Sequence, residues 1–551
     1  MVLNKKENIH RPPAWHKWLQ KLRAHLYRSP LYLVTLKKKN HLNVDGMPDM
    51  LSAGRVERGQ NIFTGQFPFA GRLYQGEDTP WTVAQDDEAW QAHIHGYNWL
   101  ADLCATNQPE ALVKARHFLS SWLDLHGVWT QLAWRADVMG DRLVSWMGFA
   151  QKLTHSADET FTKPFYNSLS LQASHLARSY FKDLSGLRLL RALRGQLYIA
   201  LFLEGFDKNL PRVLARLNQE FDQQVLADGG HVSRCPTSLL DLLALALEIK
   251  QVLELRKVEL PDQLTRAIDR MAPMVRTLRH TDGGLALFHG AQEGDAGTID
   301  QLLEQTGNQG QPLSDARHSG FQRIEAGKTV LLLDVASPPD ITLHPHGHAA
   351  PLSFEISCGE ERLLVNCGAV IGGDPNWQEA LAATAAHNTL TVDEKNCQQL
   401  IHGGGIVPRE ISVSSTRFEE DGQVLIDAKH DAYRESLGLI HERSVYVNKM
   451  GTDIRFEDKL TGTGGNSFAI SLHLHPEVQA SLVQDGQAAL LKLPSGAGWH
   501  LRVQGGKLEM RDSIYVGNPG QMRHTDQIII QGPLRGEGAD IKWRLSKIGG
   551  Q

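Results

Sequence analysis

The chain has 551 residues, of which 62 are acidic and 57 are basic, so its formal net charge at pH 7 is only −5. Nucleic-acid binding needs concentrated positive charge, and this balance gives no global argument for it. With 41% hydrophobic residues, a chain of this length is expected to form more than one domain. No apolar run approaches the roughly 20 residues that span a bilayer, so we expect no transmembrane segment.

The first 50 residues are predicted to form a basic N-terminal arm. Its basic residues are Lys5, Lys6, Arg11, Lys17, Lys21, Arg23, Arg28, Lys37, Lys38 and Lys39. We interpret it as a solvated arm; the alternative is a patch that meets an acidic polymer or an anionic membrane. The polar, charged start of the chain shows no secretory signal.

Residues 51–312 are predicted to be helical. In residues 111–126, apolar side chains recur at steps of three and four, which places them on one helix face: Leu112, Ala115, Leu119 and Trp122. Residues 236–250 begin with Pro236 and are then apolar on most faces, which is typical of a buried helix. Residues 187–203 have a similar pattern.

Residues 313–551 change to the two-residue period of strands. In residues 352–357, Leu352, Phe354 and Ile356 alternate with three polar residues, Ser353, Glu355 and Ser357. Further short β-rich runs are residues 362–366, 388–393, 443–448, 453–458 and 468–475. Gly, Asn and Asp separate these runs, which predicts an antiparallel sandwich. The expected fold class is therefore multidomain α + β, with the changeover in residues 307–319.

The densest chemical signal is the histidine series His344, His346 and His348. Residues two apart in an extended chain project from one face, so the three imidazoles are expected to line one surface. Imidazole is both a general base near neutral pH and a common metal ligand. Ordinary hydrogen-bonded histidines are the alternative, and His387 is a further candidate. A cupin-type site is disfavoured because Glu355 follows His348 by seven residues.

The helical half offers a second cluster in residues 227–234. An acid, two glycines, His231 and Arg234 precede a buried helix whose N-terminus favours anionic groups. A simple glycine-rich turn with solvated charges is an equally good interpretation. Tryptophans most often fill cores, but some stack on sugar rings while arginines hold carboxylates or sulfates. Trp134 and Arg135 are such candidates.

Several motifs, in order and spacing, resemble the heparinase II/III group of polysaccharide lyases, the alginate and heparin lyase type. In the second half they are HGHAAPLSFEIS, ERLLVNCG, AAHNTLTVD, HDAYRESLGLIHERSVYV, DIRFEDKL and SLHLHP. In the first half they are FPFAGRLYQGEDTPW, HGYNWLADL, WRADVMGDRLVSW and ADGGHVSRCP. The resemblance implies an N-terminal (α/α) toroid followed by a C-terminal antiparallel β-sandwich. It also implies cleavage of a polysaccharide that contains uronic acid by β-elimination.

The resemblance assigns roles to individual residues. The implied catalytic residues are His346, His231 and Arg234; the implied metal ligands are His348 and His387, which hold zinc in some members. The implied substrate-binding residues are Arg188, Gln196, Trp134 and Arg135. The chemistry itself requires no cofactor, so any zinc would be structural.

The sequence departs from the family pattern at several positions. Ser238 stands where a tyrosine is expected, Asn366 where a metal-ligating Asp is expected, and Ala350 where an acid often follows the histidines. The amide that neutralises the uronate carboxylate has no clear match, and Arg188, Arg194 or Gln196 are its candidate substitutes.

Three functions stay open at this point. The favoured one is a lyase acting on an anionic polysaccharide, with a polysaccharide substrate and no nucleic acid as partner. The second is a protein that has lost catalysis and binds glycan as a scaffold in cell-envelope polysaccharide metabolism. The third is a glycoside hydrolase, which needs two paired carboxylates that the sequence does not pair. The resemblance implies the cell envelope (periplasm), and the visible N-terminus favours the cytoplasm as the alternative.

Overall fold

The computed structural model describes residues 25–36, 47, 54–76, 79–179, 181, 183–339, 346–534, 536 and 538–549. The predicted basic arm therefore lies largely outside the described residues, and so does His344. The chain divides into two compact units, each described here by itself. The first unit holds Met1–Phe69, Leu73–Leu184 and Arg188–Leu214, and the second holds Ala70–Arg72, Ser185–Leu187 and Ala215–Gln551.

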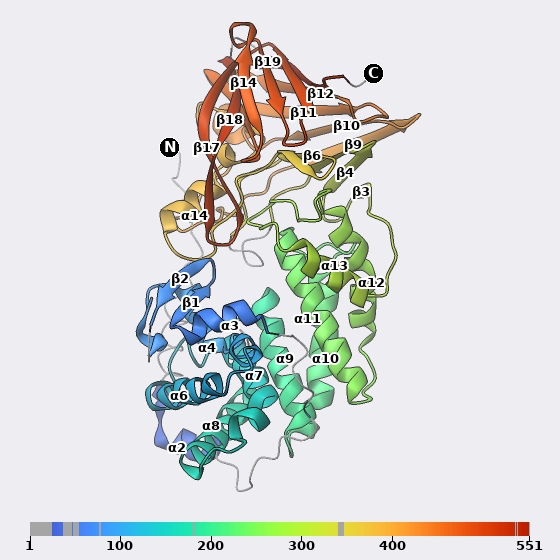
Figure 1. The fold of residues 1–551 in the computed structure, drawn as a ribbon. Helices are drawn as coiled ribbons and strands as arrows, with labels where there is room; N and C mark the ends of the chain where they lie inside the picture. The colour runs from blue at the N-terminus through green and yellow to red at the C-terminus, as the bar shows by residue number, and fades with distance from the viewer. Residues whose placement is uncertain are drawn as a thin grey trace, which may run out of the picture. The chain divides into compact units, whose positions relative to one another are not determined.

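Helices dominate the described residues up to Gln305 (Figure 1). They are α2 (Pro30–Leu36), α3 (Val56–Phe63), α4 (Glu88–Gly96), α5 (Leu100–Ala105), α6 (Pro109–His126), α7 (Ala136–Thr154), α8 (Glu159–Arg178), α9 (Gly186–Phe202), α10 (Leu210–Gln224), α11 (Pro236–Leu255), α12 (Asp262–Thr277) and α13 (Ala296–Gln305). The three helices expected from their apolar spacing are confirmed as α6, α9 and α11. Pro236 lies in the first turn of α11, where its missing N–H costs no helical hydrogen bond.

A buried arginine organises the first unit. Arg142 of α7 is 0% exposed, and it donates to the side-chain oxygen of Gln172 at 2.7 and 2.8 Å. It also donates to the carbonyl oxygens of His95 and Ala133 at 2.8 and 2.7 Å. Its guanidinium carbon lies 4.3 Å from the ring centroid of Trp122. Burial lowers the pKa of Arg142 to about 9, and these acceptors replace the water that the group has lost.

Strands dominate the described residues after α13. They are β3 (Asp315–Ala316), β4 (Phe321–Ala326), β5 (Thr329–Asp334), β6 (Phe354–Cys358), β7 (Glu361–Leu364), β8 (Leu390–Val392), β9 (Val413–Glu420), β10 (Gln423–His430), β11 (Leu439–Val447), β12 (Asp453–Gly462), β13 (Ser467–His473), β14 (Gln479–Val483), β15 (Ala488–Lys492), β16 (Gly498–Gln504), β17 (Lys507–Asn518), β18 (Gln521–Pro533) and β19 (Gly538–Lys547). The helical half contributes a small two-stranded sheet, β1 (Gln66–Phe69) and β2 (Arg72–Gln75).

The later strands form three antiparallel sheets within the described residues. The first is eight-stranded, in the order β14-β15-β16-β19-β12-β11-β10-β9. The second is β17-β18-β13-β8 and the third is β3-β4-β5-β6-β7. The helix-to-strand changeover falls between Gln305 and Asp315. The proposed domain limits at residues 50, 312 and 551 stay a prediction, because the second compact unit also includes α11, α12 and α13.

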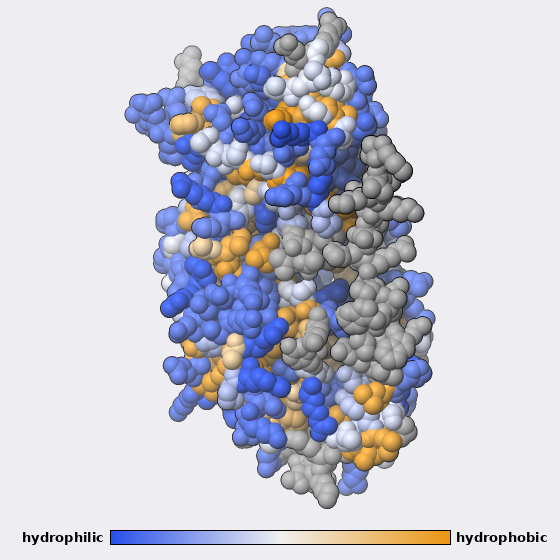
Figure 2. Space-filling view, turned by 180° about the vertical axis from the view of Figure 1, so that it is seen from behind, coloured by the Kyte–Doolittle hydropathy of each residue, from blue (hydrophilic) through white to orange (hydrophobic). Residues whose placement is uncertain are grey.

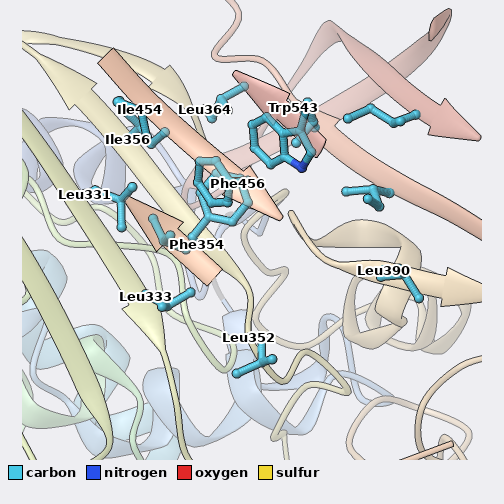
Figure 3. Close-up of a cluster of buried hydrophobic side chains, with 14 of the residues drawn as sticks. Leu331, Leu333, Leu352, Phe354, Ile356, Leu364, Leu390, Ile454, Phe456 and Trp543 are labelled. Carbon is cyan, nitrogen blue, oxygen red and sulfur yellow. The ribbon is translucent and has the colours of Figure 1, made fainter. Parts of the chain in front are cut away.

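Aromatic rings from different strands form the centre of the β core (Figure 3). Phe456 of β12 and Trp543 of β19 stack with centroids 3.8 Å apart and an interplanar angle of 3°. The ring centroid of Phe354 of β6 lies 4.6 Å from that of Phe456. Leu331 and Leu333 of β5 approach these rings from another side (Figure 3). Residues from all three later sheets therefore bury one shared apolar interior.

Buried and less buried residues alternate along β11, whereas β6 is buried throughout. Along β11 every second residue is buried, as expected for a strand with one face on the core. In β6 all five residues are buried, so the face that carries Glu355 and Ser357 is polar but is not exposed to solvent. His280, which follows α12, bonds to both side chains and covers that face.

The face shown in Figure 2 is largely hydrophilic, with smaller hydrophobic areas between the polar ones. No helix among the described residues combines the length and apolar character needed to cross a bilayer. All five cysteines are free thiols.

Replacing Phe456 by alanine should lower the free energy of unfolding by about 3–5 kcal/mol, because it empties the stacked position beside Trp543. Phe418→Ala is the matched control, because Phe418 belongs to the same sheet but is 56% exposed. Its effect should stay within about 0.5 kcal/mol. Urea unfolding of both variants checks this, and equal destabilisation would contradict the assigned core.

Candidate functional site

His346 and a buried histidine pair form the first part of the site, in the second unit. His346 stands exposed at a turn, whereas His348 is 4% and His387 1% exposed. Nδ1 of His387 lies 2.8 Å from the carbonyl oxygen of Ala383, so that nitrogen carries a proton. Its Nε2 then accepts from Nδ1–H of His348 at 2.9 Å. The segment thus presents one imidazole to solvent beside two that are fixed inside.

Burial keeps His387 neutral. The pKa of His387 falls to about 3, with burial as the largest cause. A neutral ring at neutral pH agrees with the hydrogen bonds, because His387 uses one nitrogen as donor and the other as acceptor. The pair therefore anchors the segment that carries His346.

The predicted loop at residues 227–234 is a tight turn held by Asp228. Oδ1 of Asp228 accepts from the backbone N–H of Gly230 at 3.1 Å. Oδ2 accepts from the backbone N–H groups of His318 and Ser319 at 2.8 and 2.7 Å. Gly229 has a φ of +89°, and an added Cβ would lie 2.0 Å from the carbonyl oxygen of Arg270. Only glycine fits this turn, which fastens the end of α10 to the segment before β4.

His231 and Arg234 are both buried in this loop. Nδ1 of His231 accepts from the backbone N–H of Ser233 at 3.1 Å, and the ring is 3% exposed. Arg234 has a φ of +57° and donates to the carbonyl oxygens of Ser319 at 2.6 Å and Ser337 at 2.7 Å. Its remaining contacts include the carbonyl oxygens of Gly320 and Ala336.

The Asp334 carboxylate neutralises Arg234. One oxygen of Asp334 binds the guanidinium of Arg234, and the other lies 2.8 Å from Nε2 of His289. The three side chains are at most 7% exposed. Burial alone would raise the pKa of Asp334, but Arg234 and His289 lower it below its usual range. All the donors of Arg234 thus face protein acceptors, which favours a structural role over the predicted catalytic one.

A second Asp-Gly-Gly turn repeats the first one after α12. Oδ1 of Asp282 accepts from the backbone N–H of Gly284 at 2.9 Å, and Oδ2 accepts from Nε of Arg362 at 2.6 Å. Nε2 of His280 lies 2.8 Å from Oε2 of Glu355, which also accepts from the backbone N–H of Leu287 at 3.1 Å. Both turns therefore connect a helix end to the β part of the second unit, at the segment before β4 for Asp228 and at β7 for Asp282.

The residues predicted to bind substrate in the helical half lie in the first unit. Trp134 is 3% exposed and its indole N–H donates to the carbonyl oxygen of His126 at 2.9 Å, so its ring is not presented for stacking. Gln196 is 6% exposed and its amide donates to the carbonyl oxygen of Leu176 at 2.7 Å. Trp134 and Gln196, which were expected to bind substrate, therefore lie in the core of the first unit.

The two predicted arginines of the first unit differ in exposure. Arg135 binds both oxygens of Asp137, at 2.7 and 2.9 Å, and Glu88 at 2.6 Å. Arg188 is 55% exposed at its side chain, and its contact with Glu88 is longer, at 3.5 Å. Arg188 is therefore the predicted substrate residue with the most accessible cation.

The predicted zinc site stays a prediction. Zinc in a structural site takes four ligands, and His348 and His387 would supply two of them. No cluster of three or more His, Cys, Asp or Glu that could hold a metal occurs among the described residues, and His344 lies outside them. The hydrogen bond between His348 and His387 gives each ring a polar partner without a metal ion. Asn366 accepts a backbone N–H from Asn388 at 3.0 Å and adds no carboxylate.

Sequence reasoning missed four buried residues of this region: His280, His289, Asp334 and Glu355. Their partners are far away in the sequence, with 100 positions between Arg234 and Asp334 and 75 between His280 and Glu355. No local spacing reports such pairs. The one signal was the repeated Asp-Gly-Gly, which occurs at residues 228–230 and 282–284.

Comparisons with known proteins agree with this architecture. Residues 308–544 match the family model described as Heparinase II/III-like, C-terminal. FtsZ-localized protein C of Caulobacter vibrioides (strain NA1000 / CB15N) is 28% identical over 522 residues, covering 89% of this chain and 88% of that protein.

Two solved structures share the fold. A crystal structure of Heparinase III has a TM-score of 0.74 at 13% identity, covering 98% of this chain and 93% of that one. A heparan sulfate lyase HepC mutant from Pedobacter heparinus has a TM-score of 0.61 at 17% identity, covering 96% and 88%. The expected fold class, a helical (α/α) toroid followed by an antiparallel β-sandwich, is confirmed.

Asp334→Asn should lower the free energy of unfolding by about 3–5 kcal/mol, because it leaves the guanidinium of Arg234 buried without its counter-charge. The control is Asp300→Asn, whose carboxylate is 59% exposed and lies 2.8 Å from Arg279. That change should cost at most about 1 kcal/mol. Urea unfolding at pH 7 measures both changes in the free energy of unfolding. Similar losses for the two variants would contradict the structural role of the Arg234–Asp334 ion pair.

Buried histidines should make the fold less stable between pH 6.5 and 5. Folded-state pKa values fall to about 3 for His387 and about 4 for His473 and His475, mainly through burial. In the unfolded chain the same rings bind protons near pH 6.5, so stability is complete above that pH and declines as pH falls. Urea midpoints at several pH values should show a shallower decline for His387→Gln. His402→Gln, at an exposed position, should keep the wild-type decline.

Proposed function

Because the chain is a heparinase II/III-family protein, we propose that it cleaves an anionic, uronate-containing polysaccharide by β-elimination, with His346 handling the proton. The observation that carries the proposal is the exposed imidazole of His346, two residues from a buried and hydrogen-bonded histidine. Of the three residues predicted to be catalytic, His231 and Arg234 are buried, and His346 alone is exposed.

The proposed step needs one base and one acid. A neutral imidazole takes the C5 proton next to the uronate carboxylate, the C–H electron pair forms the C4–C5 double bond, and the bond from C4 to the glycosidic oxygen breaks. The leaving oxygen then needs a proton. Where the proton and the leaving oxygen lie on the same face of the sugar, the imidazolium of His346 can return the proton that it took. Use of one histidine as both base and acid suits a chain that has Ser238 where the family has a tyrosine.

The uronate carboxylate must also be neutralised, because its charge opposes removal of the neighbouring proton. An arginine or an amide serves this purpose. Among the predicted substrate residues, Arg188 keeps an exposed guanidinium, whereas the amide of Gln196 is engaged inside the helical core. We therefore keep Arg188 as the candidate substrate cation.

A second candidate function is binding of a glycan without cleavage, as a scaffold. Ser238 in place of the tyrosine favours it, and so does the similarity to a relative whose name places it with FtsZ. The zinc expected from the resemblance would in either case be structural, held by His348 and His387.

Incubation with uronate polymers should give unsaturated ends that absorb in the ultraviolet. His346→Ala should lower that rate about 10²- to 10⁴-fold, which is the usual contribution of a general acid–base group. His402→Ala replaces another exposed histidine of the same unit and should leave the rate unchanged. Folded wild-type protein that yields no product on alginate, hyaluronan, heparin or polygalacturonate would contradict the lyase proposal. Saturable binding to one of these without product would then support the scaffold.

A further inference from the structure

A row of arginines crosses the outer face of the eight-stranded sheet. Tyr446 of β11 is directly opposite Arg455 of β12, Arg455 is opposite Arg544 of β19, and Arg544 is opposite Arg502 of β16. Neighbouring strands lie about 4.8 Å apart, so three guanidinium groups follow one another within about 10 Å. We call Arg455, Arg544 and Arg502 the arginine row.

Like charges on directly opposite residues destabilise a sheet, so the arginine row needs a reason. Asp453 offsets part of the charge: its carboxylate lies 2.6 Å from Nη2 of Arg455 and 2.6 Å from Nε of Arg544. Arg502 is exposed and forms no ion pair with any residue that the structure describes. The sheet thus keeps a cation that no carboxylate of the described chain neutralises.

A hollow of about 420 Å³ lies over the same strands. Its lining includes four cationic residues, which are the arginine row and Lys542, and one carboxylate, Glu457. The side chains of Arg455, Arg544 and Lys542 are 57%, 49% and 52% exposed. The hollow is therefore open to solvent and dominated by positive charge.

Tyr446, which stands beside Arg455 at one end of the arginine row, is held in place. The guanidinium carbon of Arg455 lies 5.2 Å from the ring centroid of Tyr446, a cation–π distance. The hydroxyl of Tyr446 donates to the side-chain oxygen of Gln423, and Leu425 stands opposite Tyr446 on β10. Tyr446 and Leu425 offer apolar surface beside cations that are already oriented, which reduces the entropy lost on binding.

We propose that this face binds a stretch of acidic polysaccharide outside the catalytic site, with carboxylate or sulfate groups on the arginine row. The choice of polymer rests on the proposed function, because the same polysaccharide would occupy both surfaces. Guanidinium groups match planar carboxylates and sulfate oxygens with paired hydrogen bonds, and the C–H faces of sugar rings suit Tyr446 and Leu425. A second copy of the chain is a poor occupant, because two arginine rows would repel each other.

The test measures binding in a His346→Ala background, so that the probe is not cleaved. Alginate and heparin are immobilised, and the dissociation constant is measured at several salt concentrations. Replacing Arg502 and Arg544 together by glutamine should weaken binding about tenfold or more. It should also lower the slope of log affinity against log salt by about two, one for each lost charge. Arg502→Lys with Arg544→Lys should recover most of the salt dependence.

The matched control is Arg511→Gln with Arg523→Gln. These two arginines lie in the four-stranded sheet, on β17 and β18, and their side chains are 46% and 43% exposed. Circular dichroism and thermal midpoints confirm that each variant folds. Unchanged affinity of the Arg502/Arg544 glutamine variant for both polymers would overturn the proposal. So would loss confined to anionic phospholipid vesicles or to duplex DNA, measured in parallel.

The outcome is separable from that of the lyase proposal. Ultraviolet product formation is followed with His346 intact and with the arginine row replaced, on short uronate oligosaccharides. If the row fails as a binding surface, turnover by the wild type still stands. If no product forms with any protein, the effect of the row on affinity is still measured.

Discussion

The second unit depends on the neutralisation of one buried guanidinium. Arg234 reaches from the end of a helical hairpin into the β part, where Asp334 supplies the counter-charge and His289 completes the carboxylate's hydrogen bonds. A cation without that carboxylate would cost several kcal/mol, so the loop that carries Arg234 and the strand that carries Asp334 must form together. The left-handed backbone of Arg234 is part of the same requirement, because it aims the side chain inward.

The two Asp-Gly-Gly turns extend this fastening. In each turn one carboxylate oxygen caps the turn itself and the other reaches the β part, through Ser319 for Asp228 and through Arg362 for Asp282. The same short motif thus serves local and long-range structure together. The exposed His346 is supported differently, by the hydrogen-bonded pair of His348 and His387. The buried ion pair of Arg234 with Asp334 and the hydrogen-bonded histidine pair therefore hold separate parts of the unit.

Periodicity was a good guide to elements and a poor guide to partners. Apolar spacing predicted α6, α9 and α11, and two-residue alternation predicted β6, because both patterns report one apolar face. The pattern did not show that Glu355 is buried, because the histidine that bonds to it lies 75 positions away in the sequence. For the site, motif resemblance found the exposed His346 but also selected Trp134 and Arg234. Both side chains are buried, and the contacts of Arg234 lie 85 to 103 positions away, beyond any local window of sequence.

The region that matches the C-terminal family model begins at residue 308, yet its buried charges depend on residues that precede it. A fragment starting at 308 would keep Asp334, Glu355 and Arg362 but lose Arg234, His280 and Asp282. Three strand side chains would then sit desolvated and unmatched. The part of this chain that folds on its own should therefore be wider than the matched sequence signature and include the helices from about residue 215.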